Sequence, residues 1–137
     1  MPRVWSQFSK RSKYYISRHI FMTVYHYCLN YDEWVSEYNL NVGLRKGEGE
    51  GGGRSKGEQD PTSEQAIRLA DLYQKIETIR SAAYAAEPEL YDYLLAYVTQ
   101  SDMTFDKLKA RGMPCERKMF YDRRRKFYWI MSKKLHL

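Results

Sequence analysis

The sequence has little cysteine and no long apolar run. Its 137 residues include two cysteines, Cys28 and Cys115, too few for the disulfide framework of a small secreted protein. No apolar stretch approaches the roughly 18 residues that a transmembrane helix needs. The first residues carry charge but lack the apolar core of a secretory signal. We therefore expect a cytoplasmic protein with free thiols and no membrane partner.

Glycine is scarce outside one segment. Seven of the eight glycines lie between Gly43 and Gly57. The surrounding segment, 43–63, mixes charges of both signs and contains no aromatic residue, so it cannot bury apolar surface. We interpret it as a flexible linker. It would divide the chain into an N-terminal Tyr-rich helical segment, 1–42, and a helical domain, 64–137.

Residue patterns typical of catalysis and of metal binding are also lacking. The chain has no phosphate-binding loop and no nucleophile elbow. His19, His26 and Cys28 are spaced so that one helix face cannot present all three, and zinc sites favour four ligands in short pairs. We expect no enzyme activity, no catalytic residues, no metal and no cofactor.

Aromatic residues and unevenly distributed charge are abundant. The chain has 13 Tyr, 5 Phe and 3 Trp, and its 23 basic and 17 acidic residues give a net charge of +6. Residues 104–137 hold 11 basic and 3 acidic groups, a net +8, whereas residues 61–103 hold 3 and 7, a net −4. This asymmetry is typical of a protein whose C-terminal end binds a polyanion.

Apolar residues recur at helical spacing throughout, and no strand or internal repeat is evident. The sequence therefore predicts an all-α fold, a small helical bundle with a C-terminal helix-turn-helix over 104–134. The predicted helices cover about 18–29, 33–38, 64–86, 88–100, 105–111 and 116–134.

The C-terminal pair of helices has clear boundary signals. Thr104 can cap the first, short helix, which Phe105 and Leu108 would anchor. Gly112 stands where a left-handed residue ends a helix. Met113 and Pro114 then form the turn before the last helix.

The last helix is expected to have an apolar and a basic face. Met119, Phe120, Phe127, Ile130 and Met131 would face the core. A stripe at i, i+4, i+7 and i+11 would lie opposite, as a recognition helix in the major groove of double-stranded DNA requires. The predicted DNA-binding residues are the members of this stripe, Arg117, Tyr121, Arg124 and Tyr128, and the flanking Lys118 and Arg125.

A second aromatic group lies between Trp5 and Trp34. It could be a stacking platform or a surface that docks a protein such as RNA polymerase. The alternative, which we favour, is that these rings cover the 64–100 helices as a small Tyr-rich core. Lys10, Arg11, Lys13 and Arg18 could add a second phosphate contact.

Two blocks totalling about 55 residues resemble proteins of prophages and mobile elements in Gram-positive bacteria. The block TFDKLKARGMPCERKMFYDRRRKFYWIMSKKL resembles the C-terminal helix-turn-helix of the ArpU and RinA late-gene transcription regulators and, more distantly, region 4 of sigma factors. The block RSKYYISRHIFMTVYHYCLNYDEW is similar to the start of uncharacterised prophage proteins. The resemblance implies control of phage genes in the bacterial host cell by DNA binding, with roles for Arg117, Lys118, Tyr121, Arg124 and Arg125.

The leading hypothesis is therefore a sequence-specific, phage-type DNA-binding transcription regulator, with RNA polymerase as a further partner. One alternative is a DNA-packaging component like a small terminase, which would require a homo-oligomer. Another is a protein-interaction module that inhibits a nucleic-acid enzyme through the same basic face.

Overall fold

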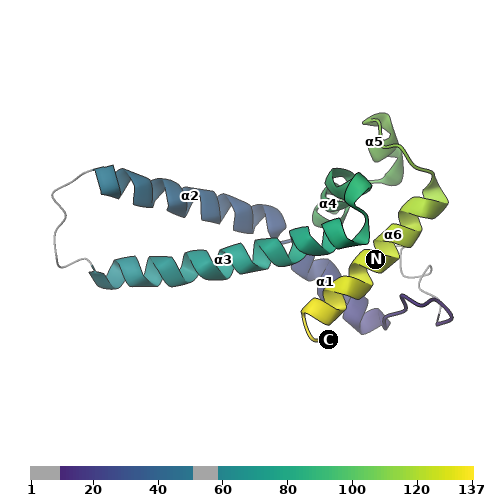
Figure 1. Cartoon of the computed structure of the whole chain (residues 1–137), viewed down its shortest axis with the longest axis horizontal. Coiled ribbons are helices and arrows are strands. Elements are labelled where there is room, and N and C mark those ends of the chain that lie inside the picture. Colours follow the sequence, from purple (N-terminus) through teal and green to yellow (C-terminus); the bar gives the residue numbers. More distant parts are fainter. Residues whose placement is uncertain (1–9, 51–58) are drawn as a thin grey trace. The chain divides into compact units, whose positions relative to one another are not determined.

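The computed structural model describes residues 10–50 and 59–137, with side chains placed for 10–43 and 63–137. Every regular element in these ranges is a helix (Figure 1). The chain forms two compact units: unit 1 combines 1–30 with 78–137, and unit 2 is 31–77. The helices are α1 (Arg18–Cys28), α2 (Tyr31–Glu50), α3 (Gln59–Ala86), the 3-10 turn η3 (Pro88–Leu90), α4 (Tyr91–Thr99), α5 (Phe105–Ala110) and α6 (Arg117–Lys134).

The predicted all-α class is confirmed for the described residues, but the domain boundaries differ from expectation. Unit 1 joins the N-terminal segment to the C-terminal one, and α3 contributes to both units. The predicted short helix over 33–38 is instead the 20-residue α2, and α3 already begins at Gln59. Both helices thus extend into the predicted 43–63 linker, whose central residues, 51–58, lie outside the described ranges.

Unit 2 is a pair of helices, α2 and the first part of α3. Leu69, Leu72 and Ile76 recur at i, i+3 and i+7 and are buried, which places one apolar edge of α3 inside. The guanidinium of Arg68 donates to both carboxylate oxygens of Glu37 at 2.7 and 2.8 Å. This bidentate ion pair joins α2 to α3 at the solvent-exposed surface of unit 2.

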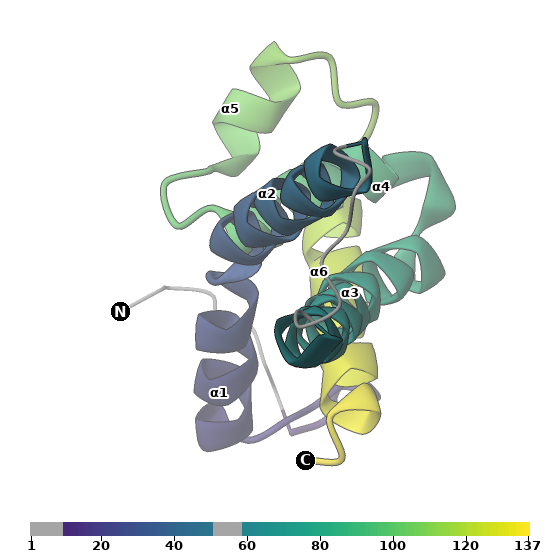
Figure 2. The same ribbon diagram turned by 90° about the vertical axis from the view of Figure 1, so that its left-hand side faces the viewer.

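Unit 1 is built around α6, which packs against α1 (Figure 2). Ser17 caps α1 through its hydroxyl, which accepts from the backbone N–H of Ile20 at 3.2 Å. Phe21, Val24 and Cys28 follow at i, i+3 and i+7 and are fully buried. The ring of Phe21 meets Tyr128 of α6 edge to face at 4.9 Å.

Some residues of the N-terminal aromatic group therefore lie in the core. The sequence predicts that this group covers the 64–100 helices, whereas α1 packs against α6 as well as α4. Phe21 and Tyr31 are buried. The half-buried members are Tyr14, Tyr15, Tyr25, Tyr27 and Trp34. Trp5 and Phe8 lie outside the described residues.

Candidate nucleic-acid interface

The sequence correctly predicts how α5 begins and ends. The hydroxyl of Thr104 accepts from the backbone N–H of Lys107 at 3.1 Å and caps the first turn. Gly112 has a φ of 99°, in the left-handed region. The backbone N–H of Gly112 donates to Lys109 and that of Met113 to Leu108, which is the hydrogen-bond pair of a Schellman motif. The chain therefore turns sharply after α5.

Two buried residues, Met113 and Cys115, anchor the turn between α5 and α6 in the core of unit 1. The ammonium of Lys109 donates to the carbonyl oxygens of both, each at 3.1 Å. Burial raises the pKa of the Cys115 thiol. The neutral thiol packs in the turn, and the two hydrogen bonds of Lys109 stabilise the turn.

The inner face of α6 contains three of the five apolar residues expected there. Phe120, Phe127 and Met131 are fully buried. The centre of the Phe120 ring lies 5.0 Å from that of Tyr97 in α4 and 5.8 Å from that of Phe105 in α5. Met119, by contrast, is 39% exposed.

The sequence predicts that Arg124 and Tyr128 lie on the DNA-binding face of α6, but the structure buries both. Their side chains are 1% and 2% exposed, so neither can reach a ligand. Residue 124 lies one helical turn from both Phe120 and Phe127, and that position is inside once these rings are inside. The spacing of the stripe is helical, but its C-terminal members, Arg124 and Tyr128, lie on the inner face of α6.

Arg124 is held among tyrosines. Its Nη1 donates to the hydroxyl of Tyr97 at 2.7 Å, and its guanidinium carbon lies 4.2 Å from the centre of the Tyr121 ring. Removal from water lowers the pKa of the guanidinium and raises that of the Tyr128 phenol. These contacts bind α6 to α4.

Arg117, at the first turn of α6, is exposed and positioned by its neighbours. Its Nη1 donates to the hydroxyl of Tyr121 at 3.2 Å and its Nη2 to Asp106 Oδ1 at 3.2 Å. Its guanidinium also lies over the Phe105 ring at 4.5 Å. The half-buried Tyr121 thus links the buried Arg124 to the exposed Arg117.

The solvent-facing stripe of α6 starts one residue later than predicted. It runs at i, i+4, i+7, i+11 and i+15 and contains Lys118, Asp122, Arg125, Trp129 and Lys133, all exposed or half-buried. The sequence reasoning found Lys118 and Arg125 but missed Trp129 and Lys133. The same helical periodicity, advanced by one residue, would have found both.

Asp122 shares its carboxylate between two arginines. Arg123 Nη1 donates to Asp122 Oδ2 at 2.6 Å, and Arg125 Nη2 lies 3.6 Å from Oδ1. Arg123 also donates to Glu87 Oε1 at 2.8 Å, which lowers the pKa of that carboxyl. Arg123 therefore connects α6 to the residue before η3, whereas Arg125 makes only the longer contact with Asp122.

Charge separates between the two units. Unit 1 holds 17 basic and 7 acidic residues, a net +10, and unit 2 holds 6 and 10, a net −4. The cationic excess is thus on the unit that contains α5 and α6. A polyanion would be attracted to this unit and repelled by the other.

The described residues give no sign of a metal site, because their His, Cys, Asp and Glu side chains form no group of three that could hold an ion. None of the described helices combines the length and the apolar character needed to cross a membrane. The chain matches no protein family, no curated protein and no solved structure.

Proposed function

We propose that the protein binds double-stranded DNA sequence-specifically through α5 and α6, as a transcription regulator of the phage or mobile-element type. The observation that carries the proposal is the outer stripe of α6. Three cations, one carboxylate and an aromatic ring occupy this stripe, while the opposite face of the same helix is anchored in the core. Recognition helices in DNA-binding proteins have this two-sided construction.

In this proposal α5 and α6 act as a helix-turn-helix. The N-terminal half of α6 enters the major groove, where Lys118 and Arg125 contact base edges or phosphates. Arg117, oriented by Tyr121, extends this contact at the start of the helix. Arg124 and Tyr128, which the sequence had assigned to the DNA, instead hold the recognition helix in place.

The acidic Asp122 on the same stripe argues for specificity rather than uniform attraction. A carboxylate repels phosphate but can accept a hydrogen bond from the amino group of cytosine. Its position between Lys118 and Arg125 restricts where phosphates can approach the helix. We also propose RNA polymerase as a further partner of this regulator. We likewise propose that the regulator forms a homo-oligomer.

The experiment is selection of binding sites from a random duplex pool at near-physiological salt. We expect an enriched sequence motif, and inverted half-sites would add a dimer. Retention without enrichment would support the packaging alternative instead. Failure to retain any duplex would contradict DNA binding and leave the protein-interaction alternative.

The selected motif then permits a matched comparison of variants. Arg125→Ala is expected to lower affinity for the motif by about 5- to 150-fold, because a good base contact contributes about 1–3 kcal/mol. The control is Arg68→Ala, which removes the same charge from the surface of unit 2, where an exposed ion pair contributes little. Equal affinities for the two variants would contradict the assignment of α6 as the reading helix.

A further inference from the structure

The segment before α1 is attached to the outer stripe of α6. The ring of Tyr14 lies 5.7 Å from that of Trp129, and both side chains are half-buried. A tight turn shapes the segment, since the backbone N–H groups of Tyr14 and Tyr15 donate to the side chain and the carbonyl of Ser12, each at 3.1 Å. The buried Ile16 anchors its end. Residues 12–16 therefore form a fixed part of unit 1.

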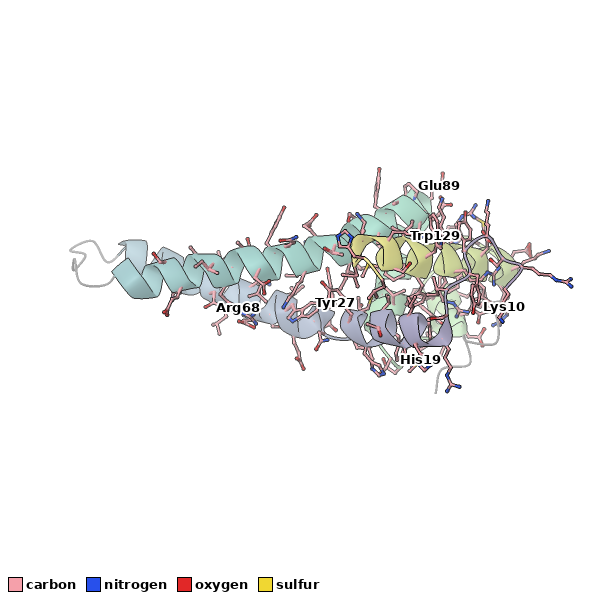
Figure 3. All side chains as sticks on the ribbon, turned by 90° about the horizontal axis from the view of Figure 1, so that it is seen from below. Lys10, His19, Tyr27, Arg68, Glu89 and Trp129 are labelled. Atoms are coloured by element: carbon pink, nitrogen blue, oxygen red, sulfur yellow. The ribbon has the colours of Figure 1, made fainter. Side chains whose placement is uncertain are left out.

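Lysines surround this pair of rings. The ammonium of Lys13 lies 5.1 Å from the centre of the Tyr14 ring, and that of Lys133 lies 5.4 Å from the Trp129 ring. Lys13 and Lys133 are exposed, and no carboxylate in the described part of the chain forms an ion pair with either. We call Lys13, Tyr14, Trp129 and Lys133 the Trp129 cluster. The exposed Lys10 precedes it, and Figure 3 labels Lys10 and Trp129 on this unit.

We propose that the Trp129 cluster is a second DNA contact that binds the phosphate backbone beside the groove occupied by the start of α6. This inference rests on the proposed function. Residues 118 and 133 are separated by 15 residues, or about 22 Å along a helix. The major groove is only about 12 Å wide. A straight helix whose first half is in the groove therefore carries its second half to the backbone.

The chemistry of the cluster fits phosphate better than base edges. Lysine ammonium groups are mobile point charges that suit phosphate oxygens, whereas bidentate reading of a base is typical of arginine. The two rings supply a flat apolar surface against which deoxyribose can pack. The cluster would thus orient α6 on the duplex without reading sequence itself.

The test is a double variant, Lys13→Ala with Lys133→Ala, titrated with the selected duplex and with a random duplex over a range of salt concentrations. Loss of two phosphate contacts should reduce the slope of log K against log salt by about 1.8. Affinity should fall equally on both duplexes, so that their ratio is unchanged. The charge-matched control, Arg68→Ala with Lys134→Ala, removes two exposed cations outside the cluster and should retain the slope.

The outcomes separate this inference from the proposed function. Wild-type protein that binds no duplex contradicts the function itself. If Arg125→Ala weakens binding but the double variant keeps the wild-type slope, the function stands and the second contact is wrong. A changed ratio between the two duplexes would assign the cluster to base reading and would overturn the inference.

Discussion

Arg124 is the largest side chain that is fully buried in the described part of the chain. Moving a guanidinium out of water is costly unless hydrogen bonds and nearby polarisable groups offset the loss of hydration. The offset here includes a 2.7 Å hydrogen bond to Tyr97 and the faces of two tyrosine rings, those of Tyr97 and Tyr121. The aliphatic stem also fills space between buried rings. Arg124 is therefore a structural residue of unit 1.

Replacing Arg124 separates its structural role from a DNA-contact role. Arg124→Ala should destabilise the protein by about 2–4 kcal/mol, since it leaves a cavity, whereas the volume-conserving Arg124→Met should lose less. Urea unfolding followed by tryptophan fluorescence measures both. At a temperature where Arg124→Met is folded, its DNA-binding slope against salt should equal that of the wild type; a decrease of about 0.9 would indicate a direct phosphate contact.

Glu87 gives unit 1 a pH-dependent component of stability. Its pKa is lowered below the ordinary 4.5 by the hydrogen bond from Arg123, so the pairing stabilises the fold above that pH and is lost as pH falls through the lowered value. Glu87→Gln should therefore be less stable than the wild type at pH 7, and the difference should shrink toward pH 3. Urea midpoints across this range test the effect, and a difference independent of pH would mean that the ion pair contributes nothing.

The residues of α6 show how far a sequence pattern can be read without a structure. The helix, its caps and its buried Phe120, Phe127 and Met131 follow from periodicity and turn chemistry. Periodicity does not show which stripe faces water, because polar Arg and Tyr side chains can be buried when they bind one another. Arg117, Tyr121, Arg124 and Tyr128 all carry polar groups, but the positions of the phenylalanines require Arg124 and Tyr128 to lie inside.

At the scale of elements, Gly112 and Gly43 are opposite cases. Gly112 has a φ of 99°, where a Cβ costs about 1–2 kcal/mol, while Gly43 lies within α2 and an added Cβ would meet nothing within 4 Å. Gly112→Ala should therefore destabilise the protein by about that amount, and Gly43→Ala should stabilise α2 by about 0.5–1 kcal/mol. Thermal unfolding of the two variants checks both signs; a shift in the same direction for both would contradict the backbone argument.

The element that sequence reasoning most underestimated is α2. The sequence predicts a helix over only 33–38 here, because the glycines after residue 42 indicate a break. A glycine costs about 1 kcal/mol in a helix, and a helix that has already nucleated propagates one bond at a time. The contact of Tyr38 with Tyr73 at 6.2 Å and, more weakly, the exposed Glu37–Arg68 pair join α2 to α3, so tertiary pairing can outweigh local propensity.

At the scale of the whole molecule, the two units have unequal cores. Among the described side chains of unit 2, 31–43 and 63–77, the buried apolar ones are few: Tyr31, Leu69, Leu72 and Ile76. Unit 1 encloses most of the remaining core, including the rings of α1 and α6. Because regions with few buried apolar contacts open at lower free energy, unit 2 should unfold without unit 1.

Hydrogen exchange measured by mass spectrometry tests this difference. Peptides from 31–43 and 63–77 should exchange faster than peptides from α6 under native conditions, and moderate urea should widen the gap. Simultaneous exchange of both sets at one rate would show that the chain opens as a single cooperative unit. A duplex bound by α6 should slow exchange in unit 1 more than in unit 2.

The burial of both thiols provides two internal reporters of opening. Cys28 is completely inaccessible on α1, whereas Cys115 is 8% exposed in the turn before α6, and burial raises the pKa of each. An alkylating reagent can therefore label Cys115 when the turn opens, but Cys28 only when α1 separates from its neighbours. The labelling times of the two sites, without any introduced probe, record how often the α5–α6 turn opens and how often α1 leaves the core of unit 1.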